Sequence, residues 1–161
     1  MKFLITLSAV FASLISFGQQ ISEDDLSMSL VAKYYYQYPN AEGQTWTKVV
    51  KGGEERFNVE FTFEGKDYSV SYNKQAWRLT ERIKLTSKEV PATTFDFVTR
   101  RFSDDKFKIT AFTQLNTFEN LRPADSFYSM EVKVKKDLYV LYFDEKLEHL
   151  DGSSTQVLSG L

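Results

Sequence analysis

The chain has 161 residues, a formal net charge of −2, 26% charged residues and no cysteine. The lack of cysteine excludes a disulfide framework and lipid attachment through a thiol, and the interleaved charges lack the basic surplus that a nucleic-acid-binding face needs. Aromatic residues make up 16% of the chain, enough to build the core of one domain from large apolar side chains.

The N-terminus has the layout of a secretory signal peptide. A basic start at Lys2 is followed by an uncharged apolar run over residues 3–15, and the small residue Gly18 precedes a possible cleavage site. The run is too short for a membrane span with flanking residues. We therefore predict a signal peptide over residues 1–18 and a single exported domain over 19–161, in the periplasm or secreted.

A first helix is expected next, followed by a group of strands. "SEDD" from Ser22 resembles a capping box, apolar residues then recur at helical spacing as far as Tyr38, and Pro39 ends the pattern. After a polar-aromatic strand "TWTKVV" at 45–50, the stretch "RFNVEFTF" at 56–63 alternates apolar with polar residues, as a strand with one buried face does.

Glycines mark the turns between these strands. Gly52 and Gly53 predict a hairpin turn before the alternating strand, and Gly65 predicts a second one after it. The next strand alternates in the same way over residues 68–72, and a shorter one continues from Trp77.

The same plan returns in the second half. A helix is expected from Pro91 to Phe102, then a strand "FKITAFTQL" at 107–115, a loop over 116–125, and a hairpin over 127–143 with the apolar spacing of the first half. The fold class expected is α+β: two tandem repeats (about 22–86 and 87–150) and a tail (151–161). Each repeat is a helix followed by about four antiparallel strands, and together they form one continuous sheet with the helices on one face.

This order of motifs resembles the PepSY-like family of beta-lactamase-inhibitor-like proteins. The resemblance covers roughly residues 26–150 and is carried by "YPNA" at Tyr38, the following Trp46, "FNVEFTFEGKDYSVSYN", "AWRLTE", and a second helix opening at Val90-Pro91. It implies the fold of the beta-lactamase inhibitor protein, whose concave sheet can grip a partner protein, and no catalytic residue. The family commonly has a glycine in the turn where this chain has residues 73–76, which leaves that turn type open.

The helix-free face of the second half is the first candidate site. "LYVLYF" at 138–143 has no polar side, so one of its two apolar faces must lie away from the helices. A cover is expected, because each uncovered large apolar side chain forgoes roughly 1.5–3 kcal/mol. The cover is either a partner or the chain's own 116–125 loop or 151–161 tail. The predicted partner-binding residues are Phe112, Phe127, Leu138, Val140 and Tyr142.

Two sets of polar residues are candidates for chemical sites. His149 has acidic neighbours, but without a second histidine or an EF-hand spacing a solvated strand end is the favoured interpretation. Glu60 and Glu131 take matching places in the two halves, which repeat symmetry explains without a carboxylate pair. No nucleophile motif is present, so we expect no catalytic residue, no metal and no cofactor.

These features favour an exported, non-enzymatic binding module that engages a protein or peptide through the helix-free face, with inhibition as one form. The alternative is a structural or envelope-stress protein whose sheet face is closed by its own tail or by a homodimer. Neither nucleic acid nor a membrane span after signal cleavage is expected, and the sequence does not predict an oligomeric state.

Overall fold

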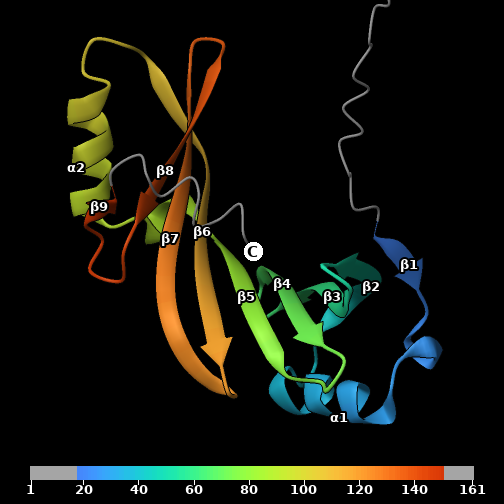
Figure 1. The fold of residues 1–161 in the computed structure, drawn as a ribbon. Coiled ribbons are helices and arrows are strands. Elements are labelled where there is room, and N and C mark those ends of the chain that lie inside the picture. The colour runs from blue at the N-terminus through green and yellow to red at the C-terminus, as the bar shows by residue number, and fades with distance from the viewer. Residues whose placement is uncertain (1–17, 151–161) are drawn as a thin grey trace, which may run out of the picture.

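The computed structural model describes residues 18–150, and its core is one antiparallel sheet in which each strand pairs with the next along the chain (Figure 1). The predicted signal peptide and tail thus lie outside the described residues, apart from Gly18. The α-helices are α1 (Met28–Gln37) and α2 (Ala92–Arg101). The strands are β1 (Gln19–Ile21), β2 (Glu42–Lys51), β3 (Glu54–Phe63), β4 (Lys66–Asn73), β5 (Arg78–Leu85), β6 (Phe107–Glu119), β7 (Arg122–Val134), β8 (Asp137–Phe143) and β9 (His149–Leu150).

Both helices lie on the outer side of the curved sheet (Figure 1). Helix α1 precedes β2–β5 and α2 precedes β6–β9, so the α+β class and the single sheet are confirmed. That the two halves are copies of one unit stays a prediction. Neither helix has the length and apolarity needed to cross a membrane, as far as the described residues go.

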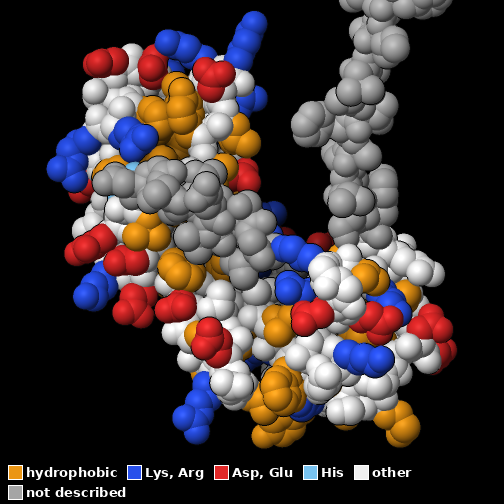
Figure 2. All heavy atoms as spheres, in the orientation of Figure 1, with side chains coloured by type: hydrophobic (Ala, Val, Ile, Leu, Met, Phe, Trp, Pro, Cys, Tyr) orange, Lys and Arg blue, Asp and Glu red, His pale blue; other side chains and the backbone are white. Residues whose placement is uncertain are grey.

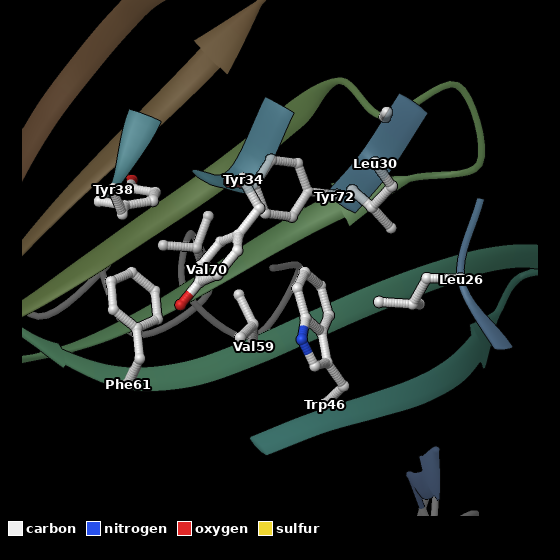
Figure 3. Packing of buried hydrophobic residues seen from close by; sticks show 10 residues of the cluster. Leu26, Leu30, Tyr34, Tyr38, Trp46, Val59, Phe61, Val70 and Tyr72 are labelled. Atoms are coloured by element: carbon white, nitrogen blue, oxygen red, sulfur yellow. The ribbon is translucent and has the colours of Figure 1, made fainter. Parts of the chain in front are cut away.

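The first hydrophobic cluster lies between α1 and strands β2–β4 (Figure 3). Tyr34 is fully buried at its centre, with its ring 5.2 Å from those of Trp46 and Phe61 and edge-on to both. Such edge-to-face contacts suit the aromatic quadrupole and add about 0.5–1.5 kcal/mol each beyond area burial. The alternating residues of "RFNVEFTF" therefore turn their apolar side to the helix, as predicted.

The second cluster lies between α2 and strands β6–β8. Met130, Val132 and Phe143 are fully buried in it, and Val98 of α2 packs on them from the helix side. In α2 the core-facing positions are Thr94 and Val98, both fully buried, whereas Phe95 is 47% exposed. The predicted helix over 91–102 thus forms, and it faces the core through Thr94 and Val98.

Two predicted boundaries were wrong. The capping box closes on Ser22 and Asp25, but it caps a single 3-10 turn; α1 itself starts at Met28, where the Ser27 hydroxyl accepts a hydrogen bond from the backbone N–H of Leu30. The expected 116–125 loop is instead strand, because β6 and β7 run on to a two-residue turn whose residues Asn120 and Leu121 both have positive φ. Such paired positive φ angles fit a tight hairpin of the primed type.

A polar network joins the two clusters at β5. The Glu81 side chain is almost fully buried and lies on the helix side of the sheet, between Val70 of β4 and Asn116 of β6. Its carboxylate accepts hydrogen bonds from the Tyr38 hydroxyl, from Arg78 Nη1 at 2.9 Å and from Asn116 Nδ2 at 2.9 Å. A buried carboxylate needs such partners, because burial removes its water.

Replacing Glu81 by glutamine tests how much this network contributes to stability. Glu81→Gln removes the charge that Arg78 faces, and we expect the free energy of unfolding in urea to fall by roughly 1.5–3 kcal/mol, as for hydrogen bonds to charged groups. The control is Lys135→Gln, because Lys135 pairs with Asp105 at 2.6 Å but its side chain is 74% exposed. That change should cost under about 1 kcal/mol, and equal losses in the two variants would contradict a structural role for the network.

Burial of tyrosine hydroxyls predicts loss of stability in alkali. Burial, with smaller contributions from Tyr35 and Glu23, raises the pKa of Tyr34 well above its ordinary value of 10.0. Above pH 10 the unfolded chain loses the Tyr34 proton, while the folded chain keeps it until the pH reaches the raised pKa. This group's contribution to stability is therefore complete below pH 10 and falls by about 1.4 kcal/mol per pH unit above it.

The variant Tyr34→Phe removes this titration together with a buried hydroxyl that has no hydrogen-bond partner among the described residues. We expect its unfolding temperature, followed by circular dichroism, to match or exceed that of the wild type at neutral pH and to fall less steeply above pH 10. Tyr36→Phe, at a side chain 88% exposed, serves as the control. Parallel curves for wild type and Tyr34→Phe would refute the assignment.

Candidate binding face

The helix-free face is the side of the sheet opposite both helices. Strand alternation places Thr80, Arg82 and Lys84 of β5 on this face, because Glu81 and Ile83 between them point to the helices. Three hollows open along the face, and Arg82 lines all of them. Their positions divide the face into a polar half over β2–β5 and an apolar half over β5–β8.

The apolar half contains four of the five residues predicted from the sequence. Leu138 and Val140 are 58% and 43% exposed, and Phe127 and Tyr142 are half-buried. Phe127, Val140 and Tyr142 line a hollow of about 360 Å³ together with Leu115. In the orientation of Figure 2, hydrophobic side chains lie among charged ones on the part of the molecule that β6–β8 and α2 form.

Phe112 was predicted on this face and lies on the other one. It is buried in the second cluster, opposite Met130, with its ring stacked on that of Tyr128. The cause is a β-bulge in β6, where the pairing with β7 shifts between Ile109 and Ala111. One extra residue reverses the alternation beyond it, so Leu115 takes a place on the helix-free face.

Two segments of the chain itself, 116–125 and 151–161, were candidates to cover this face. The 116–125 stretch cannot fold over it as a loop, because it belongs to β6 and β7 and their turn. The 151–161 tail lies outside the described residues. Within them, β9 adds to the edge of β8, with Leu150 paired to Tyr142.

The polar half has two hollows. The larger, about 510 Å³, carries charges of both signs: Glu60 and Asp67, with Lys84 3.5 Å from the Asp67 carboxylate. The smaller, about 200 Å³, has no carboxylate among the described residues that line it. Its lining residues are Val49, Lys51, Arg56, Asn58, Ser69, Ser71, Thr80 and Arg82.

The candidate chemical sites do not gather catalytic or metal-binding groups. His149, expected at a solvated strand end, is half-buried, and its ring stacks on Phe97 at 4.4 Å between centroids. Within residues 18–150 no three histidine, aspartate or glutamate side chains come together as metal ligands. Glu60 and Glu131 share the helix-free face but line different hollows, with β4, β5 and β6 between their strands.

Sequence reasoning missed Arg56, Arg82 and Leu115 as residues of this face. Arg56 and Arg82 come from strands separated by β4, so only the sheet order brings them to one hollow. Strand alternation in "RFNVEFTF" puts Arg56 on the polar side of the strand but does not bring it to the same hollow as Arg82. Leu115 could not have been found, because its orientation depends on the bulge.

No known family profile and no curated protein matches the sequence. Solved structures do match. A protein of Bacteroides eggerthii assigned to the periplasm is 22% identical, with a TM-score of 0.63 over 78% of this chain and 86% of that one. A DUF2874 family protein of Bacteroides uniformis is 19% identical, with a TM-score of 0.61 over 77% and 86%.

A BLIP-like protein of Bacteroides fragilis, BLIP being the beta-lactamase inhibitor protein, is 18% identical and has a TM-score of 0.59 over 78% of this chain and 83% of its own. Identities at this level establish the fold and leave the activity open. The chain therefore has a BLIP-like fold, a single antiparallel sheet with two helices on one side.

Proposed function

We propose that the protein is an exported binding module of the periplasm that holds a protein or peptide on its helix-free face and catalyses no reaction. The observation that carries the proposal is the two-sided β8. Leu141 and Phe143 are buried under α2, whereas Leu138 and Val140 on the other side of the same strand are 58% and 43% exposed. Neighbouring apolar groups on a surface mark interaction sites more often than chance.

The surroundings of these residues suit a protein interface. Aromatic side chains such as Phe127 and Tyr142 lie beside charged groups such as Arg82 and Glu131, and aromatic anchors within a polar rim are typical of interface hot spots. The described residues offer no catalytic or metal constellation that would favour an enzyme. Binding would therefore act sterically, and occlusion of an enzyme's active site is one form it can take.

The periplasmic location rests on two supports. The N-terminal layout predicts a secretory signal, and similar structures include a protein assigned to the periplasm. The similarity to a BLIP-like protein supports a sheet that grips a partner, since folds reuse their concave faces for binding.

Site-directed photo-crosslinking in the native cell envelope tests the proposal. We expect a photoreactive phenylalanine analogue in place of Val140 to form a discrete adduct with another protein. The same analogue in place of Tyr36, which is 88% exposed on α1, is the matched control and should not form that adduct. Introducing Glu131→Lys beside Val140 should weaken the adduct, because it changes the rim charge.

Three results would count against the proposal. Equal adducts from the two positions would show non-specific capture, and no adduct from position 140 would leave the face without a partner. An adduct with the mass of two copies of this chain would favour closure of the face in a homodimer, the alternative function.

A further inference from the structure

Two arginines of the helix-free face, Arg56 from β3 and Arg82 from β5, line the smaller polar hollow. Lys51 lines it as well, together with hydroxyl and amide side chains from Asn58, Ser69, Ser71 and Thr80. No described lining residue is acidic. A hollow that combines guanidinium groups with neutral donors and lacks a carboxylate of its own is electrostatically suited to an anion.

Arg56 and Arg82 lack the ion pairs that some basic residues nearby form. Lys84 on the same face pairs with Asp67 at 3.5 Å, and Lys66 pairs with Glu89 at 2.6 Å. Arg56 and Arg82 have no ion pair within residues 18–150, and the buried Nε of Arg56 has no hydrogen-bond partner there. No described carboxylate therefore neutralises either guanidinium group, and a bound carboxylate would supply that charge.

Arg82 connects this hollow to the apolar half of the face. It also lines the 360 Å³ hollow with Leu115, Phe127, Val140 and Tyr142. A ligand that reaches both hollows therefore needs an anionic group beside an apolar one. Inorganic anions meet the first need alone, whereas a peptide with neighbouring acidic and apolar side chains meets both.

We infer that the hollow between Arg56 and Arg82 is a carboxylate-binding subsite. The ligand we assign to it is an acidic side chain of a peptide segment whose adjacent aromatic or aliphatic side chain packs on Phe127 and Tyr142. The planar guanidinium suits the carboxylate, since it can donate two parallel hydrogen bonds. This inference rests on the proposed function, because it specifies the chemistry of the partner on the same face.

A pair of blocked peptides tests the subsite on the full chain. The probes are acetyl-Ala-Glu-Phe-Leu-Ala-amide and the analogue with Gln in place of Glu, titrated at millimolar concentrations into 15N-labelled protein. We expect the acidic peptide to shift the Nε–H resonances of Arg56 and Arg82 and to bind about tenfold more tightly, the effect of a hydrogen bond to a charged group. That preference should weaken as salt is raised.

Two variants test whether Arg82 is responsible for the preference for the acidic peptide. Arg82→Gln should reduce the affinity for the acidic peptide to that of the glutamine peptide, with an unchanged unfolding temperature. Arg100→Gln, on the exposed side of α2, is the matched control and should keep the tenfold preference. Loss of the preference in both variants would show a general charge effect and overturn the subsite.

Other results overturn the inference in distinguishable ways. Equal binding of the two peptides, or none, refutes the carboxylate subsite, while an adduct from position 140 would still support the proposed function. A tenfold preference without such an adduct supports the subsite and contradicts the proposed partner. Dimerisation in light scattering that Arg82→Gln abolishes would identify a second copy of the chain as the occupant and overturn the peptide ligand.

Discussion

The pairing of β5 with β6 is the contact on which the rest of the structure depends. Each hydrophobic cluster packs under one helix and could bury its own apolar side, but only this pairing joins the clusters into one sheet. The hydrogen-bonded ladder runs from Thr80 opposite Thr117 to Leu85 opposite Phe112. It places both helices on one side and so leaves a single uninterrupted face on the other.

The Glu81 network lies where this pairing crosses from one cluster to the other. Asn116 of β6 donates to Glu81 of β5, and the Tyr38 hydroxyl reaches the same carboxylate from the end of α1. A slip of one residue in the β5–β6 register would turn one side of this network to the opposite face and leave a buried carboxylate short of donors. The network therefore acts against wrong registers as well as adding stability, a role that buried polar groups serve in other proteins.

Those parts of the fold that depend on local alternation were predictable from the sequence. The β3–β4 hairpin and the two faces of β8 follow from period-two patterns, because a buried face selects apolar side chains at every second position. The positions of Phe112 and Leu115 could not be predicted, because a bulge changes the alternation without leaving a glycine or proline as a signal. The sequence left the type of the turn at 73–76 undecided. In the structure Ala76 occupies this turn with φ of 59°, a conformation that usually favours glycine.

The two faces of the sheet are under different packing constraints, and this difference explains why the candidate site has mixed chemistry. On the helix side the residues must fill a dry core, so the strands there can vary little. The other side carries no such constraint, and the two halves have used it differently: hydroxyls and charges over β2–β5, aromatic and aliphatic groups over β7 and β8. Arg82 stands at the boundary, so the ligand we propose would have to meet two unlike requirements at once. Without its acidic group that ligand would leave Arg82 without a carboxylate partner, and without its apolar group it would leave the second hollow unfilled, so the sheet order would favour discrimination against either mismatch.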